Sequence, residues 1–243
     1  MIESSNPALK KINTGVRTGT EPVMTIQGTI NATFILTTVL IAYFTYANMF
    51  TPDGQLEFGI LHIGSAIAAL ILAFVIIFKQ HWARVLSPVY AVLEGITLGA
   101  ISALFEVKYP GIATQAVLAT FGVLLSMLFA YKSRLIRPTE KFRNGVIMAT
   151  GAIFLLFMLN LVLSLFGVNV GFMHDSSPLS IGISLVIIVV ASLNLILDFD
   201  FIEKAAAQGA PKYYEWYGAF GLLVTLVWLY MEFLRLFSKL KDR

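Results

Sequence analysis

Long apolar runs alternate with short polar segments along this 243-residue chain, and seven of the runs are long enough to cross a bilayer. A membrane-spanning helix needs about 20 mostly apolar residues at a rise of about 1.5 Å each. The pattern therefore predicts an all-α, polytopic membrane bundle of seven transmembrane helices. The predicted spans are Thr25–Ala47, Phe58–Phe78, Pro88–Val107, Ile112–Tyr131, Gly145–Phe166, Leu179–Ile202 and Tyr217–Phe237.

Proline and polar residues mark the ends of the spans. Pro88 and Pro178 are expected in the first turn of the third and sixth helices, where the missing N–H of proline costs little. Residues 1–25 are polar and carry no cleavable signal pattern. We therefore expect a polar cytoplasmic amino-terminal tail, 1–25, followed by one seven-helix transmembrane domain, 26–243.

The composition agrees with this interpretation and excludes several classes of function. Hydrophobic residues are 58% and charged residues 13% of the chain, whereas a soluble domain has about 25% charged residues. The basic residues form no continuous block, so a lipid bilayer is the expected partner and nucleic acid is not. The chain has no cysteine and none of the common enzyme motifs. We expect no enzyme and no resident cofactor.

The basic residues predict the orientation in the membrane. Loops on the cytoplasmic side of a bilayer carry an excess of lysine and arginine. One side of the predicted topology holds twelve of them, which places the amino terminus in the cytoplasm: Lys10, Lys11, Arg17, Lys79, Arg84, Lys132, Arg134, Arg137, Lys141, Arg143, Lys204 and Lys212.

A second basic cluster, at the carboxyl terminus, opposes that pattern. Seven crossings put Arg235, Lys239, Lys241 and Arg243 on the outer side. Either a short tail crosses despite its charge, or the last segment is re-entrant and returns to the cytoplasm.

Four carboxylates inside the apolar runs are the first candidates for function, because an ionisable group in lipid is costly: Glu94, Asp198, Asp200 and Glu232. At about 1.5 Å per residue, Glu94 lies about 9 Å and Asp198 about 6 Å from the cytoplasmic face, so they can meet at one level. Two residues turn a helix by about 200°. Of Asp198 and Asp200, one therefore faces the interior and the other snorkels to the surface.

Neighbouring side chains suggest partners for these acids. Asn194 precedes Asp198 by four residues, on the same helix face, and is expected to hydrogen-bond it. Glu232 lies about 22 Å from the cytoplasmic face, where Arg235 can pair with it. At that depth Glu232 shares no proton with Asp198, unless the last segment is re-entrant.

Two carboxyl groups held close together in a low dielectric tend to share one proton, and such a pair senses pH. When ionised, the pair also offers hard oxygen ligands to a cation such as Ca²⁺, here at Asp198 and Glu94. In the structural alternative, each acid is protonated or paired and only locks helices together.

Three segments resemble motifs of the Bax inhibitor family of membrane proteins, in its bacterial branch. They are the third-span segment Tyr90–Ser102, with Glu94-Gly95 and Gly99; Leu197–Lys204, with Asp198 and Asp200; and Leu229–Phe237, with glutamate where the family has aspartate. The resemblance extends from about residue 26 onwards.

The resemblance implies six helices around a central seventh, and a pH-sensitive cation leak, chiefly for Ca²⁺, gated by two acids from the last two spans. Asp198 matches the first acid. Glu232 matches the second by its local motif, whereas an ungapped alignment puts a residue near Val224 there. Glu94 also matches. Proton sensing is thus assigned to Asp198, Glu232 and Glu94, and a cation pathway to Asp200, Asn194 and Glu215.

Two functions remain open. The first is a pH-sensitive Ca²⁺ leak channel of the cell (inner or plasma) membrane. The second is a non-conducting regulator that binds other membrane proteins, such as a quality-control protease, through residues 1–25.

Overall fold

The computed structural model of the protein describes residues 22–49, 60–166 and 176–242. In these ranges the chain forms seven α-helices and one short 3₁₀ helix, η1 (Gln80–Trp82). The α-helices are α2 (Ile26–Met49), α3 (Ile60–Phe78), α4 (Ala83–Lys108), α5 (Ile112–Lys132), α6 (Glu140–Leu165), α7 (Pro178–Ala207) and α8 (Tyr214–Lys241). The predicted amino-terminal tail lies almost entirely outside the described residues.

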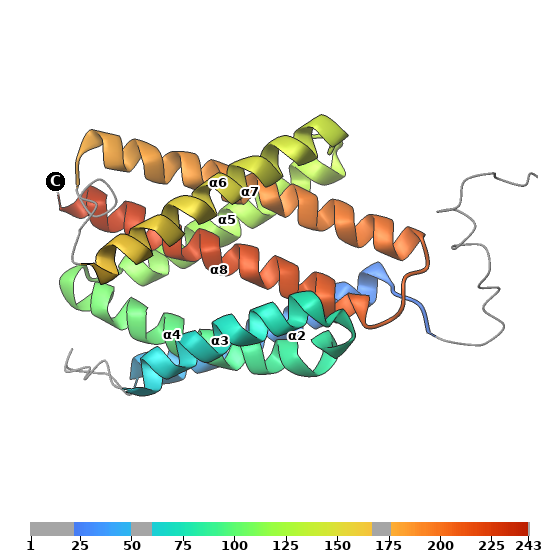
Figure 1. Ribbon diagram of the computed structural model, residues 1–243, viewed down its shortest axis with the longest axis horizontal. Coiled ribbons are helices and arrows are strands. Elements are labelled where there is room, and N and C mark those ends of the chain that lie inside the picture. The colour runs from blue at the N-terminus through green and yellow to red at the C-terminus, as the bar shows by residue number, and fades with distance from the viewer. Residues whose placement is uncertain (1–21, 50–59, 167–175, 243) are drawn as a thin grey trace, which may run out of the picture.

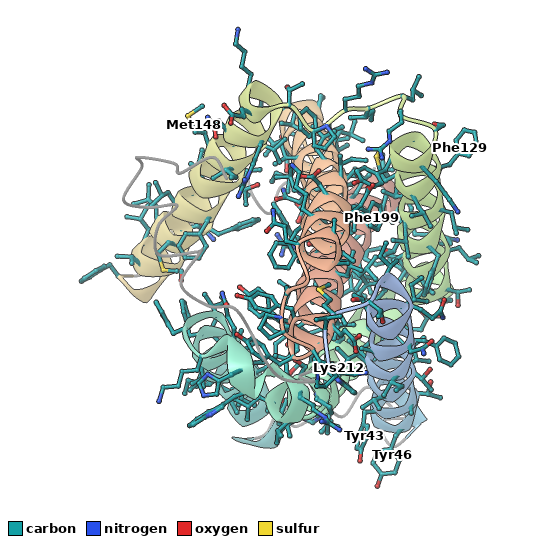
Figure 2. The ribbon with its side chains drawn as sticks, turned by 90° about the vertical axis from the view of Figure 1, so that its right-hand side faces the viewer. Tyr43, Tyr46, Phe129, Met148, Phe199 and Lys212 are labelled. Atoms are coloured by element: carbon teal, nitrogen blue, oxygen red, sulfur yellow. The ribbon has the colours of Figure 1, made fainter. Side chains whose placement is uncertain are left out.

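Six of these helices are long and apolar enough to cross a membrane. The apolar part of α3 is shorter within the described residues, His62–Phe78. Large apolar side chains also cover the outside of the bundle. Phe129 and Met148, for example, are 72% and 69% exposed and point away from it (Figure 2). Such a surface is stable only against lipid, so the chain is a multi-pass membrane protein with the predicted all-α architecture.

The last helix, α8, lies at the centre of the bundle, as predicted. It runs between a group made of α2, α3 and α4 and a group made of α5, α6 and α7 (Figure 1). It packs against α2, α4, α5 and α7. Leu223, Leu229 and Leu234 of α8 are at most 2% exposed. The side chains of α8 therefore meet protein rather than lipid over most of its circumference.

The helix α8 is one uninterrupted element of 28 residues. At about 1.5 Å per residue it is about 42 Å long, more than the hydrocarbon core of a bilayer. A re-entrant segment would need a break and a turn. The re-entrant alternative is therefore wrong, and the two ends of α8 lie at opposite ends of the bundle (Figure 1).

The boundaries of the third span differ most from the prediction. α4 begins at Ala83 rather than Pro88, so Pro88 lies inside the helix instead of in its first turn. Membrane helices tolerate an internal proline because neighbouring groups satisfy the freed carbonyl. Pro178 is the first residue of α7, as predicted, and Ser177 caps that helix by accepting from the Ser180 N–H.

A glycine sets the closest approach between α2 and α4. A Cβ atom at Gly95 would lie 2.6 Å from the carbonyl oxygen of Leu40 in α2. Backbone cannot move aside as a flexible side chain can. The small residue at position 95 therefore lets the two helices pack closely, as expected for membrane helices.

Substitution of Gly95 by alanine should destabilise the bundle by about 1–3 kcal/mol, because the added methyl group overpacks the α2–α4 contact. The measurement is the thermal unfolding of the purified protein in detergent. Gly122→Ala in α5 is the matched control, since a Cβ there meets nothing within 4 Å. Equal unfolding temperatures for the two variants would contradict this account of the contact.

Candidate functional site

Asp198 lies between α7 and the central helix α8. The Thr225 hydroxyl of α8 donates to Asp198 Oδ2 at 2.7 Å, and also lies 3.2 Å from the Gly221 carbonyl oxygen. A Cβ at Gly221 would lie 3.7 Å from Asp198 Oδ1. The carboxyl group thus sits against one turn of α8, residues 221–225. This interhelical hydrogen bond, the Asp198–Thr225 bond, joins α7 to α8 inside the bundle.

Glu94 lies at the level of Asp198, as predicted, but on the other side of α8. α4 touches α8 through the Tyr90 and Phe220 rings, with centroids 5.1 Å apart, and through a 2.5 Å hydrogen bond between Ser102 and Tyr230. Glu94 falls between these contacts, level with residues 221–225.

The two acids do not meet. Phe220 and Tyr230 each lie five residues from Thr225, which is about 140° around the helix axis. α8 therefore stands between Glu94 and Asp198, and no hydrogen bond in the described part of the chain joins them. The predicted contact between the two carboxyl groups is wrong because depth gives the level of each acid in the membrane but not the neighbour that its helix face meets.

Asp200 does not snorkel to the surface, and Asn194 has another partner than the one predicted. Asp200 is buried, at 8% exposure, and pairs with Lys204 at 2.6 Å, so Lys204 rather than Asp200 reaches the surface. The Asn194 side-chain amide donates to Thr150 of α6 at 2.8 Å and to the Val190 carbonyl at 2.9 Å. It links α6 to α7 and does not bond Asp198. Asp200 thus pairs within α7, whereas Asn194 joins two helices.

Glu215 caps a neighbouring helix. It is 4% exposed, and its Oε1 accepts from both the backbone N–H and the hydroxyl of Thr25, each at 2.9 Å. Thr25 in turn accepts from the Gly28 N–H at 2.9 Å, as a residue at a helix amino terminus does. A Cβ at Gly28 would overlap the carboxylate, 2.1 Å from Oε1. The negative charge thus meets the positive end of the α2 dipole.

Glu232 belongs to a separate buried cluster near the other end of the bundle. Its Oε2 lies 3.1 Å from Arg235 Nη1, which confirms the predicted pairing. One turn further on, Lys239 is 7% exposed, and its Nζ donates to the Ser184 hydroxyl of α7 at 2.9 Å. Thr225 and Glu232 are seven residues apart, about 10 Å along the helix. Glu232 therefore does not share a proton with Asp198.

Apolar side chains separate these two polar levels. Between Asp198 and Ser184, the face of α7 toward α8 carries Leu195 and Ala191, both 0% exposed. Between Thr225 and Glu232, α8 carries Leu226 and Leu229, which are 7% and 0% exposed. The α7–α8 contact therefore has a polar level near each end and a dry apolar layer between them.

The geometry also limits what a cation can bind. Ca²⁺ takes six to eight oxygen ligands. No group of three histidine or acidic side chains that could hold a metal ion occurs among the residues the structure describes. Asp198 and Glu94, the predicted Ca²⁺ ligands, are separated by α8.

Sequence reasoning missed two polar partners. Thr225 lies one residue beyond the apolar position that an ungapped alignment placed opposite Asp198. Lys239 was assigned to the basic cluster at the carboxyl terminus without a partner, whereas its ammonium group is inside the bundle. Lys239 lies seven residues, or two helical turns, after Glu232. This spacing puts both side chains on the same face of the helix and was the signal that could have found the buried lysine.

A polytopic helical bundle with polar contacts along its central helix belongs to the class of multi-pass membrane proteins. Comparison with protein families is more specific: the model of the family described as Bax inhibitor 1 like matches residues 5–242. The chain belongs to this family. Comparisons with curated proteins and with solved structures give no match.

Replacing Glu215 by alanine should destabilise the fold by about 1–3 kcal/mol, because two donors of Thr25 lose their acceptor. Thermal unfolding in detergent measures the effect. Glu140→Ala is the control, because Glu140 is also an acid near a helix amino terminus but is exposed. A loss no larger than in the control would rule out the capping role.

Proposed function

We propose that the protein is a pH-sensitive cation leak, conducting Ca²⁺, in which the Asp198–Thr225 bond controls the α7–α8 contact. The observation that supports this most is the position of the Asp198 carboxyl group, which α7 holds against the central helix α8 of a membrane bundle. A proton gained or lost there changes a contact between two spanning helices. Family membership supports the membrane location and the fold but does not by itself give the activity.

The proposed mechanism differs in one respect from a two-acid gate. Thr225 faces Asp198 where a second acid was expected, so repulsion between two carboxylates does not open this contact. Instead, loss of the Asp198 proton places a charge beside apolar side chains. That charge is better solvated when water enters between α7 and α8, so deprotonation favours separation of the two helices.

The apolar layer supports the assignment of the described arrangement to the closed state of the proposed leak. A hydrated cation would have to pass Leu195, Leu226 and Leu229, which pack tightly together with their neighbours. A hydrophobic constriction blocks ions as long as it stays dry. Separation of α7 from α8 would wet this layer and give the ion a path from the Asp198 level to the Glu232 level. The ion then meets oxygen atoms at both levels.

We further propose that the protein lies in the cell membrane (inner or plasma) and that the amino-terminal end of the bundle faces the cytoplasm. Most of the described basic residues lie at this end, in and beside the connections between α3 and α4, α5 and α6, and α7 and α8. The cluster at the other end has partners: Arg235 pairs with Glu232, Lys239 bonds Ser184, and Lys241 donates to the Pro110 carbonyl at 3.3 Å.

The Ca²⁺ leak of wild-type protein in liposomes should rise as the pH goes from acidic to neutral, because deprotonation of Asp198 opens the α7–α8 contact. Asp198→Asn cannot ionise and should keep the leak low and independent of pH. Thr225→Val keeps the shape of the side chain but removes the hydroxyl that donates to Asp198. Because the α7–α8 contact is then weaker, this variant should raise the leak at acidic pH. The measurement is Ca²⁺ entry into dye-loaded vesicles.

Asp242→Asn serves as the control in the same assay. Asp242 is an acid at the bundle surface, where it pairs with Lys108 at 2.9 Å, and its loss should leave the pH profile unchanged. An identical leak and pH profile in wild type and Asp198→Asn would refute the proposal. A wild type with no leak at any pH would favour the non-conducting regulator that binds other membrane proteins.

A further inference from the structure

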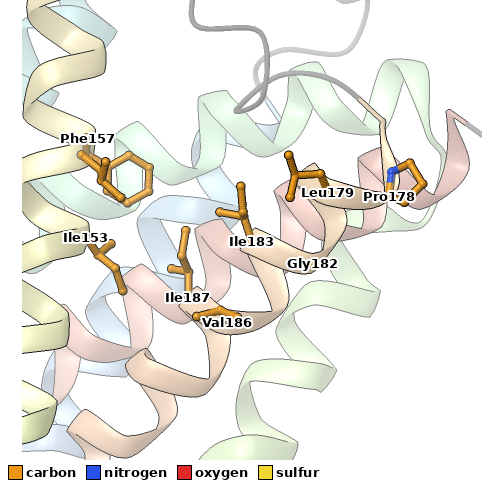
Figure 3. A pocket seen from close by; sticks show the side chains of 9 residues that line it. Ile153, Phe157, Pro178, Leu179, Gly182, Ile183, Val186 and Ile187 are labelled. Atoms are coloured by element: carbon orange, nitrogen blue, oxygen red, sulfur yellow. The ribbon is translucent and has the colours of Figure 1, made fainter.

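An apolar groove lies between α6 and α7 on the outside of the bundle. It has a volume of about 620 Å³ and only apolar lining residues. Figure 3 shows Phe157 and Ile153 of α6 facing Ile183 and Ile187 of α7 across it. In the described part of the chain α6 makes its main contact with α7 alone, so the groove is open on the membrane side. Its volume is within the usual range for ligand pockets, about 300–1,000 Å³.

A positive charge lies beside this groove. The Arg235 guanidinium stacks over the ring of Phe157, 5.0 Å from its centroid, and Phe157 is one of the lining residues. The Arg235 side chain is 33% exposed. Its partner Glu232 lies close but has no well-aligned hydrogen bond at Oε2. The guanidinium therefore keeps donor capacity for a second acceptor.

The surrounding cluster has more positive than negative charge. Among the residues that the structure describes, Glu232 is the acid beside two cations, Arg235 and Lys239. Lys239 Nζ bonds neutral oxygens, Ser184 Oγ at 2.9 Å and the Ser180 carbonyl at 3.5 Å, and pairs with no carboxylate among the described residues. The Ser180 hydroxyl there is fully buried and has no partner within the described chain. A buried excess charge is stabilised by a nearby anion.

The depth of Arg235 suits the phosphate of a membrane lipid. α8 is about 42 Å long and the hydrocarbon core about 30 Å thick, so about 6 Å of helix projects at each end if it is centred. Arg235 lies six residues before the end of α8, Lys241, or about 9 Å from it. It is therefore just inside the hydrocarbon boundary, where an arginine side chain reaches headgroups.

We propose that the α6–α7 groove binds an anionic phospholipid, with one acyl chain along Ile153, Phe157, Ile183 and Ile187 and the phosphate against Arg235. The groove supplies the apolar contact and the net positive cluster supplies the charge preference. A phosphate also accepts two parallel hydrogen bonds from a guanidinium. This inference does not depend on ion conduction.

The test uses delipidated full-length protein in detergent, titrated with phosphatidylglycerol or with phosphatidylcholine of the same chains and followed by native mass spectrometry. Wild type should bind phosphatidylglycerol about tenfold more tightly. Arg235→Gln should remove most of this preference. Glu232→Gln should increase it, because Arg235 loses its competing carboxylate.

Filling the groove tests the position of the acyl chain. A Cβ at Gly182 meets nothing within 4 Å, so Gly182→Leu should enter the groove without a clash and weaken phosphatidylglycerol binding about tenfold. Val186→Trp fills the same groove from a residue that is 62% exposed and covers the case in which the first variant does not fold. Gly122→Leu, at an equally open position in α5, is the matched control.

Two results would overturn the proposal. One is equal affinity of the wild-type protein for the two lipids, which means that the charged cluster selects no headgroup. The other is unchanged phosphatidylglycerol binding in a folded groove-filling variant, which places the lipid elsewhere on the bundle.

Discussion

Burial of the central helix is the constraint on which the rest of this structure depends. A helix surrounded by other helices in a membrane has no water to satisfy its polar side chains, so each of them needs a partner from a neighbour. α8 meets this need from end to end: Glu215 caps α2, Thr225 bonds Asp198, Tyr230 bonds Ser102, and Lys239 bonds Ser184. These bonds fix the register of α8 against α2, α4 and α7.

Because of the same constraint, two kinds of acid lie in the contacts of α8, two from α8 itself and one from α7. Glu215 and Glu232 each have a positive partner, the amino terminus of α2 and the Arg235 side chain. Their charges serve to hold helices together. Within the described chain, the hydrogen-bonding partner of Asp198 is a neutral hydroxyl group, that of Thr225. Its contact therefore changes most when a proton binds or leaves, which is why we assign the control of the α7–α8 contact to this residue.

The architecture was predictable from the sequence because a bilayer imposes a length and a composition on every span. Apolar runs of about 20 residues gave the seven helices, and the Glu232–Arg235 pair followed from helical spacing. The contact of Glu94 with Asp198 was predicted wrongly. Depth along a helix follows from residue number, but the neighbour of each face depends on the packing of all helices, and α8 lies between these two acids.

The partners of Asn194 and Thr225 show the same limit. Asn194 has an equally good local acceptor in the Val190 carbonyl and an interhelical one in Thr150, so its spacing from Asp198 did not decide its bond. Thr225 is an ordinary residue in a membrane helix, and only its position opposite Asp198 gives it a role. Pro88 likewise predicted the start of a helix but lies inside a longer one. An internal proline is tolerated there because other groups of the bundle can satisfy the freed carbonyl.

The central claim is that α7 must separate from α8 for cations to pass. A disulfide tests it directly, since the chain has no other cysteine. A Cβ at Gly218 in α8 would lie 3.0 Å from Ile202 Cγ1 in α7, so cysteines at these two positions can bond. The Ca²⁺ leak of the Ile202→Cys/Gly218→Cys protein at neutral pH should vanish on oxidation and return on reduction. An equal, pH-dependent leak in the oxidised and reduced protein would contradict the account.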